Sequence, residues 1–162
     1  MQDKIGFEEH FNLSQFDKDT PEYVSPLTMA EIRGRLLDVG ETRLQDMDAA
    51  GIAYALLSLT APGIQAVPDP REAVRLARDA NDALAGIVAG NPVRYGGMAA
   101  LPLQDPRAAI SELERCVTQL GFPGIMVNGF TNTPDGTGAW YLDDERYLPF
   151  WEAVESLGVP FY

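Results

Sequence analysis

Three segments of this 162-residue chain end in the same way, with a helical apolar pattern, a glycine and then an apolar run. The three junctions are Ala50-Gly51-Ile52, Leu120-Gly121-Phe122 and Leu157-Gly158-Val159. Glycine readily adopts the left-handed conformation found at helix ends, so each junction indicates a helix followed by a strand. The chain is therefore predicted to repeat a β/α unit, with four complete units and the start of a fifth strand.

Two of the predicted helices also begin in the same way. Asp69-Pro70 and Asp105-Pro106 each place an N-cap aspartate before a proline at the first helical position. A helical pattern also covers residues 33–50, and a last helix is expected after Asp143 or Asp144.

The apolar runs between the helices are continuous rather than alternating, as in Ile52–Leu59. Such runs favour strands covered on both faces, as in a parallel sheet. An open doubly wound sheet and a (β/α)₈ barrel both fit this pattern. We expect the first strand, residues 4–11, to be buried and to lie in the middle of the sheet.

The ends of the predicted strands favour the barrel. No glycine-rich phosphate-binding turn follows the first strand, and polar side chains gather at the carboxyl ends of strands, where a barrel carries its active site. These side chains are Glu8, His10, Thr60, Gln104 and Asn128. A full barrel needs about 250 residues. We therefore predict an α/β fold in which residues 1–162 form a single domain, the N-terminal half of a (β/α)₈ TIM barrel, as a truncated product or a partial sequence.

Two long loops are predicted, over residues 12–34 and 129–142. Loops of this length in compact domains are often functional. Phe16, Tyr23 and Val24 of the first loop could close over a ligand, although ordinary packing against the body of the domain fits equally well.

Composition excludes several classes of partner. The net charge of −12, from 24 acidic and 12 basic residues, disfavours nucleic acids and anionic membranes. No apolar run approaches the ~20 residues of a membrane helix, and no signal peptide is visible. The single cysteine, Cys116, falls on a helical apolar face and is expected to be a core thiol. These features favour the cytoplasm.

The first strand ends in a carboxylate and the only histidine of the chain. Because side chains alternate along a strand, Glu8 and His10 should point to one side and Glu9 to the other. A carboxylate and an imidazole at this spacing form half of a site for a divalent metal ion. On this motif alone, an exposed strand end with a hydrogen-bonded histidine is the simpler interpretation.

Six motifs follow one another along the chain: Glu8-Glu9-His10-Phe11, Thr60-Ala61-Pro62-Gly63-Ile64-Gln65, Ala80-Asn81-Asp82, Leu101-Pro102-Leu103-Gln104-Asp105-Pro106, Leu120-Gly121-Phe122-Pro123-Gly124 and Val127-Asn128-Gly129. Together they resemble the non-oxidative aromatic-acid decarboxylases of the amidohydrolase superfamily, most closely the γ-resorcylate (2,6-dihydroxybenzoate) decarboxylases and next the 2,3-dihydroxybenzoate decarboxylases. The resemblance covers nearly the whole chain and is weakest over residues 12–34. It favours the metal site over the simpler interpretation of Glu8 and His10.

The resemblance implies a carboxy-lyase that works as a homodimer or homotetramer on a small aromatic carboxylic acid. Its Mn²⁺ or Zn²⁺ is held by the Glu-x-His of the first strand, a histidine at the fifth strand and an aspartate at the eighth. Glu8 and His10 match the first pair, and the other ligands and the proton-donating aspartate are expected beyond Tyr162. His10 favours the resorcylate branch, because the 2,3-dihydroxybenzoate enzymes tend to have a small residue there.

The resemblance also bears on the substrate pocket. Ala61 and Gly63 are expected to line its wall, and Asn128 to reach the substrate or orient a metal ligand; turn geometry alone is the alternative for each. An ortho-hydroxybenzoate chelates a divalent ion through its carboxylate and phenolate oxygens. Protonation of the carboxylate-bearing carbon breaks aromaticity, and loss of CO₂ restores it.

Two other functions stay open. One is a metal-dependent hydrolase of the same superfamily that acts through metal-activated water. The other is an inactive half-barrel that pairs with another chain through its open sheet edge. If the chain alone held metal tightly, Asp135 or Asp143 of the second loop would be candidate additional ligands.

Overall fold

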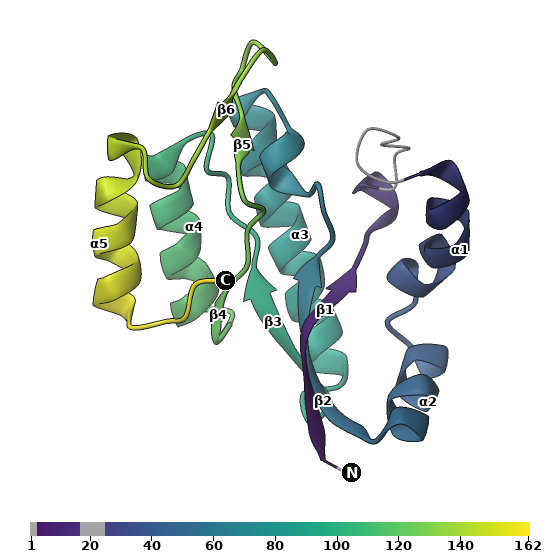
Figure 1. Cartoon of the computed structure of the whole chain (residues 1–162). Coiled ribbons are helices and arrows are strands. Elements are labelled where there is room, and N and C mark those ends of the chain that lie inside the picture. Colours follow the sequence, from purple (N-terminus) through teal and green to yellow (C-terminus); the bar gives the residue numbers. More distant parts are fainter. Residues whose placement is uncertain (1–2, 17–24) are drawn as a thin grey trace.

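The computed structural model describes residues 3–16 and 25–162. Within them, four parallel strands form one sheet in the order β1-β2-β3-β4, and two short antiparallel strands form a separate hairpin, β5-β6 (Figure 1). The strands are β1 Lys4–Phe11, β2 Ile52–Leu59, β3 Tyr95–Ala99, β4 Gly124–Ile125, β5 Thr131–Asn132 and β6 Ala139–Trp140.

The helices follow one another around one side of the sheet (Figure 1). Each parallel strand is joined to the next through at least one of them, which is the predicted β/α repeat. The α-helices are α1 Pro26–Leu37, α2 Glu41–Ala50, α3 Pro70–Gly90, α4 Pro106–Thr118 and α5 Leu148–Leu157, and the 3₁₀ turns are η1 Ser14–Phe16, η2 Ile64–Ala66 and η3 Glu145–Tyr147.

The strand order identifies the architecture as half of a (β/α)₈ barrel. Consecutive strands are neighbours in the sheet, whereas a doubly wound sheet reverses direction near its first strand. After α5, Phe161 forms a parallel bridge with Ile125, so a further strand begins beside β4 as predicted. The sheet thus continues in chain order.

The prediction of a buried first strand in the middle of the sheet is wrong. β1 lies at the edge of the described sheet, where Ile5 and Phe7 remain 69% and 49% exposed. In a barrel of eight strands the first strand gains its second neighbour only on closure, and these four strands form an open sheet.

The first predicted loop and helix are also partly wrong. The chain turns helical at Pro26, where the Ser25 hydroxyl accepts a hydrogen bond from Thr28 N, and α1 and α2 are separate helices. Ser25-Pro26 is the same start signal as Asp69-Pro70, but little apolar periodicity follows it. Met29 is the buried residue of α1, and Leu27 is 81% exposed.

The remaining helix ends agree with the sequence. The Asp69 carboxylate accepts from Glu72 N, and the Asp105 carboxylate accepts from Arg107 N and Ala108 N. Gly51, Gly121 and Gly158 have φ angles of 69°, 71° and 63°, the left-handed conformation expected at these junctions. Asp144 caps η3, which leads into α5.

The second predicted loop contains the β5-β6 hairpin. Thr131 and Asn132 pair with Trp140 and Ala139, and these strands are only two residues long. Strands of two residues are too short to show an alternation of apolar and polar side chains, so the sequence indicates a loop there.

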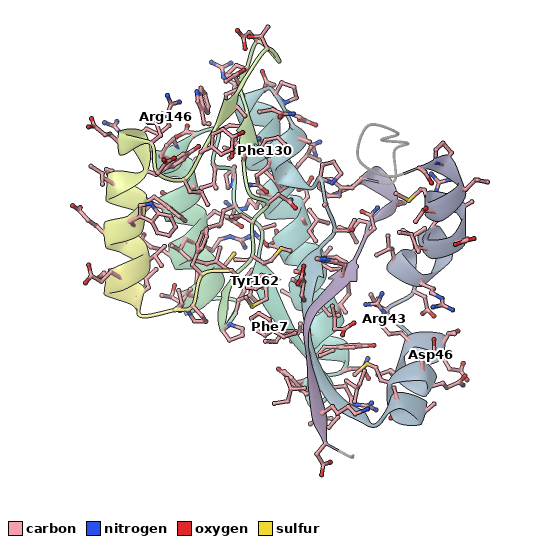
Figure 2. All side chains as sticks on the ribbon, viewed as in Figure 1. Phe7, Arg43, Asp46, Phe130, Arg146 and Tyr162 are labelled. Atoms are coloured by element: carbon pink, nitrogen blue, oxygen red, sulfur yellow. The ribbon has the colours of Figure 1, made fainter. Side chains whose placement is uncertain are left out.

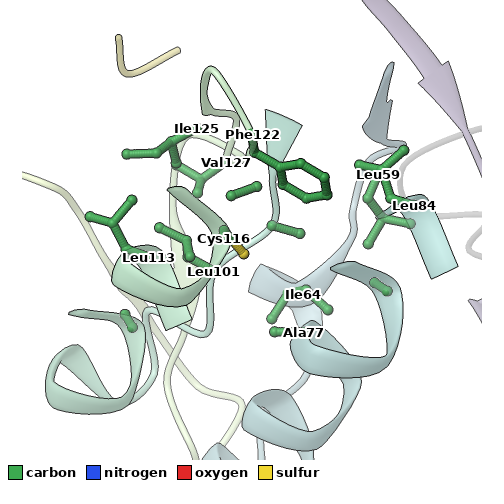
Figure 3. Packing of buried hydrophobic residues seen from close by; sticks show 14 of the residues in the cluster. Leu59, Ile64, Ala77, Leu84, Leu101, Leu113, Cys116, Phe122, Ile125 and Val127 are labelled. Carbon is green, nitrogen blue, oxygen red and sulfur yellow. The ribbon is translucent and has the colours of Figure 1, made fainter. Parts of the chain in front are cut away.

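The core lies between the sheet and helices α3 and α4 (Figure 3). Cys116 is fully buried there, as predicted, and burial raises the pKa of its thiol well above the usual range. Gly97 of β3 allows close packing, because a Cβ at this position would lie 2.7 Å from Phe122 Cε1 and 3.0 Å from Leu84 Cδ2.

A buried polar cluster joins α3 and α4 to the end of β3. Asn81 Nδ2 donates to the Ala100 carbonyl (2.9 Å) and to Glu112 Oε1 (2.8 Å), while Asn81 Oδ1 accepts from Ala100 N (3.0 Å). Arg115 pairs with Glu112 and, at the surface, with Asp82. Asn81 therefore fixes the strand end that precedes the Leu101–Pro106 motif.

None of the helices in the described part of the chain combines the length and apolar character needed to cross a membrane, and this includes the 21-residue α3.

Candidate metal centre

His10 is fixed by the pairing of β1 with β2. The strand register places it beside Ser58, and His10 Nδ1 lies 3.0 Å from Ser58 Oγ. Arg43 of α2 donates to the His10 carbonyl (2.8 Å), which ties this strand end to the helix (Figure 2). The imidazole therefore has a defined orientation, with Nε2 left for another partner.

Glu8 lies at an irregularity in the same strand. Gly6 pairs with Ala55 and Glu9 with Leu57, so β1 carries one more residue than β2 in this interval. Glu8 has a φ of 71°, which is uncommon for a residue with a side chain and tends to occur at functional sites. Its Oε1 lies 3.6 Å from His10 Nε2, so the two side chains share one side of β1.

Glu9 lies away from this pair, as alternation predicts. It lines a cavity of about 320 Å³ between β1, β2 and α2, together with Arg43, Asp46 and Met47.

The carboxylate and imidazole fit a divalent metal ion. Atoms that bind one zinc ion at about 2.1 Å each lie no more than about 4.2 Å apart, and Glu8 Oε1 and His10 Nε2 satisfy that limit. Among residues 3–16 and 25–162, no group of three or more His, Cys, Asp and Glu side chains could hold a metal ion. The pair is thus a partial ligand set.

Asp135 does not join this pair. Its carboxylate, at the tip of the β5-β6 hairpin, accepts hydrogen bonds from the hydroxyls of Thr133 (2.5 Å) and Thr137 (2.8 Å). These bonds and one from Thr137 N lower the pKa of Asp135 to about 2. Asp143 likewise belongs to no metal-binding cluster within the described residues.

Tyr162 contacts Glu8 from the far end of the chain. Its hydroxyl donates to Glu8 Oε2 at 2.6 Å, and its ring packs edge-on against Phe7 with 5.2 Å between ring centroids (Figure 2). The hydrogen bond to the carboxylate raises the pKa of Tyr162.

The three residues expected at the substrate pocket lie together. Asn128 Nδ2 donates to the Pro62 carbonyl (2.9 Å). A Cβ atom added to Gly63 would lie 3.0 Å from the same nitrogen. Gly63 also has a φ of 56°, so both its conformation and its contact favour glycine. Asn128 therefore holds the loop that follows β2.

Two cavities flank that loop. Ala61 and Gly63 line one of about 290 Å³, together with Phe16, and Ala61 and Asn128 line another of about 200 Å³. The described residues around these two cavities do not include Glu8 or His10. Tyr23 and Val24, the other residues proposed to close over a ligand, lie outside the described residues.

Other polar groups at the strand ends hold the structure together. Gln104 Nε2 donates to the carbonyls of Ile64 (2.6 Å) and Val67 (2.8 Å), and buried Gln65 donates to the Leu101 carbonyl (2.7 Å). Gln104 is thus a structural residue rather than part of the metal centre.

Sequence reasoning missed Ser58 and Tyr162. The available signal for Ser58 is a polar residue inside an apolar run. Nothing local links Tyr162 to a residue 154 positions earlier.

The chain is similar in sequence to known decarboxylases. The chain is 50% identical over 162 residues to a γ-resorcylate decarboxylase of Rhizobium sp. (strain MTP-10005), a match that covers all of this chain and 50% of the relative. It is 47% identical to a γ-resorcylate decarboxylase of Polaromonas sp. (strain JS666 / ATCC BAA-500), again with all of this chain and 50% of the relative covered. The chain spans about half the length of the curated relatives it matches.

Solved structures give the same result. A 2,6-dihydroxybenzoate decarboxylase complexed with 2,6-dihydroxybenzoate matches with a TM-score of 0.94 and 50% identity, over all of this chain and 50% of that one. A dihydroxybenzoic acid decarboxylase from Polaromonas sp. JS666, with bound manganese and the inhibitor 2-nitroresorcinol, matches with a TM-score of 0.93 and 47% identity, over all of this chain and 49% of that one.

The family profile Amidohydro_2, amidohydrolase, matches residues 31–162, which include all the described strands after β1. The chain therefore belongs to the Amidohydro_2 amidohydrolase family.

Proposed function

We propose that this chain supplies two metal ligands and part of the substrate pocket of a carboxy-lyase that releases CO₂ from 2,6-dihydroxybenzoate or a similar hydroxybenzoate. The observation that carries the proposal is the Glu8–His10 pair, whose Oε1 and Nε2 atoms lie 3.6 Å apart on one side of β1. The γ-resorcylate decarboxylases, of which this chain covers about half, carry this substrate class in their names, and one solved relative is complexed with 2,6-dihydroxybenzoate.

Each ligand has a defined part in this proposal. Glu8 supplies an anionic oxygen and His10 a neutral nitrogen, a donor set that suits Mn²⁺ or Zn²⁺. In the tautomer with its proton on Nδ1, His10 would donate to Ser58 Oγ and keep the Nε2 lone pair free. A divalent ion bound here would supply Lewis acidity for the carboxylate and phenolate oxygens of the substrate.

Small side chains suit the proposed pocket wall. Ala61 and Gly63 carry no bulky side chain in the loop after β2, and both border the cavity of about 290 Å³, whose described lining does not include Glu8 or His10. Asn128 keeps that loop in place through Pro62. The role proposed for Asn128 is therefore to shape the wall rather than to orient a metal ligand.

We also propose that residues 1–162 belong to one barrel domain of a homo-oligomeric cytoplasmic enzyme. The free, buried thiol of Cys116 is consistent with a reducing compartment. An exposed aromatic pair, Phe130 and Tyr141, with ring centroids 6.2 Å apart, offers apolar surface for a second subunit.

A chimera tests the proposed activity. These 162 residues would replace the half of the Rhizobium sp. (strain MTP-10005) decarboxylase with which they align. We expect the Mn²⁺-loaded chimera to convert 2,6-dihydroxybenzoate to resorcinol and CO₂, and to leave benzoate, which lacks the ortho hydroxyl, unchanged.

The matched variant of the chimera is His10→Ala, which should lose the activity. Hydrolysis of a lactone or amide without CO₂ release would favour the hydrolase instead. A folded chimera that binds Mn²⁺ and releases no CO₂ from any hydroxybenzoate would overturn the proposal.

A further inference from the structure

We infer that Tyr162 is a positioning residue for the metal centre: its hydroxyl holds one oxygen of Glu8 so that the other oxygen faces His10. This inference rests on the proposed function, because it assigns a role to Tyr162 only if Glu8 and His10 bind an ion. It goes further in naming a residue that acts through a ligand.

The position of Tyr162 is set from two directions. Its backbone N–H donates to the Ile125 carbonyl (2.9 Å) and its carbonyl accepts from Val127 N (3.1 Å), so β4 and the residues after it hold the main chain. Its ring meets Phe7 of β1 at an interplanar angle of 85°. The hydroxyl is therefore placed by contacts other than the one it makes with Glu8.

The two oxygens of Glu8 have different partners. Oε2 accepts from the Tyr162 hydroxyl at 2.6 Å, whereas Oε1 lies 3.6 Å from His10 Nε2. The Glu8 side chain is 45% exposed, so burial alone does not fix its rotamer. A hydrogen bond to Oε2 restrains the carboxylate and leaves Oε1 as the oxygen beside His10.

A phenol suits this role better than a cation. A lysine or arginine beside Glu8 would place a positive charge next to the proposed ion and oppose its binding. Tyr162 is a neutral donor and leaves the carboxylate charge available. Each proposed ligand then has one hydrogen-bond partner that orients it: Ser58 for His10 and Tyr162 for Glu8.

The test is Tyr162→Phe, which removes the hydroxyl and keeps the ring that packs on Phe7. The chain has a single histidine, so its imidazole NMR signals belong to His10 alone. We would titrate the 162-residue chain with Mn²⁺ and record the concentration at which these signals broaden. We expect Tyr162→Phe to need roughly 10 to 100 times more Mn²⁺, the usual effect of losing a partner of a metal ligand.

Two variants serve as controls. Tyr141→Phe removes an exposed hydroxyl on the residue after β6 and should leave the titration unchanged. Glu8→Gln keeps the shape of the side chain and should weaken Mn²⁺ binding whatever the role of Tyr162. The thermal midpoint of each metal-free variant is measured alongside, because a contact that merely ties β1 to the chain end would change stability and not affinity.

The outcomes separate this inference from the proposed function. An unchanged Mn²⁺ titration for Tyr162→Phe, with or without a change in stability, overturns the inference. The Tyr162→Phe and Tyr141→Phe substitutions are also made in the chimera. Electron paramagnetic resonance of free Mn²⁺ then gives a second measurement of Mn²⁺ affinity. Weakened affinity in a chimera that releases no CO₂ would support the inference and contradict the decarboxylase proposal.

Discussion

His10 Nδ1 lies 3.0 Å from the hydroxyl oxygen of Ser58, directly across the register of β1 and β2. Ser58 is 1% exposed and the His10 side chain is 28% exposed, so the contact is partly buried. An imidazole that binds a metal through Nε2 carries its proton on Nδ1, and Ser58 Oγ is placed to accept it. The strand pairing thus orients the imidazole before any ion binds.

Replacing Ser58 by alanine should therefore weaken metal binding while leaving the ligands intact. We expect Ser58→Ala to lower Mn²⁺ affinity by roughly 10- to 100-fold, measured by broadening of the His10 signals. The matched control is Ser111→Ala, which removes an exposed hydroxyl from α4. Equal affinity in the two variants would show that Ser58 does not orient the imidazole.

Asn81→Ala should destabilise the fold strongly. The substitution leaves the buried N–H and carbonyl of Ala100 without the partners they have now. We expect the free energy of unfolding to fall by about 3 kcal/mol in urea denaturation, since each orphaned buried group costs about 1–3 kcal/mol. Gln45→Ala, at an exposed position of α2, should change it by less than about 0.5 kcal/mol.

Two glycine-to-alanine substitutions should have opposite effects. Gly97→Ala places a methyl group 2.7 Å from Phe122 Cε1 and should cost about 1–3 kcal/mol. Gly86→Ala, on the exposed side of α3 with no neighbouring atom within 4 Å outside its own helix, should stabilise the chain by about 0.5–1 kcal/mol. Thermal midpoints shifted in the same direction would contradict the packing described for β3.

The β5-β6 hairpin should respond to acid. Hydrogen bonds lower the pKa of Asp135 from 3.8 to about 2. Because the folded pKa lies below the unfolded value, the stabilisation is complete above about pH 4 and is lost as the pH falls towards 2. Carboxyl ¹³C NMR titration should give this low midpoint, and Thr133→Val should raise it. Thr118→Val, on α4, should leave it unchanged.

Much of the fold can be predicted from the sequence, because its signals are local. The three glycine junctions and the Asp-Pro starts are read from neighbouring residues, and the strand over 52–59 and the helix starting at Pro70 lie where expected. Most of α1 falls in the loop predicted over residues 12–34, because a mostly exposed helix lacks an apolar stripe and Ser25-Pro26 alone does not distinguish a helix start from a loop. The place of β1 at the sheet edge depends on closure, which no local pattern records.

In the candidate site, too, the features set by local spacing could be predicted, and those set by strand pairing or distant residues could not. The spacing in Glu8-Glu9-His10 indicates two side chains on one face, and their atoms do lie 3.6 Å apart. The bulge that gives Glu8 a φ of 71° depends on how β1 pairs with β2, so strand alternation alone does not indicate it. Ser58 and Tyr162 reach the pair from 48 and 154 residues away, distances over which periodicity carries no information.

The manganese content of the purified chimera, measured after gel filtration, tests the central claim most directly. If Glu8 and His10 hold the ion, the parent chimera should retain close to one Mn²⁺ per chain, whereas Glu8→Gln and His10→Ala should each lose most of it while remaining folded. If both variants kept as much manganese as the parent, the ion would be bound elsewhere and the account of this site would be wrong.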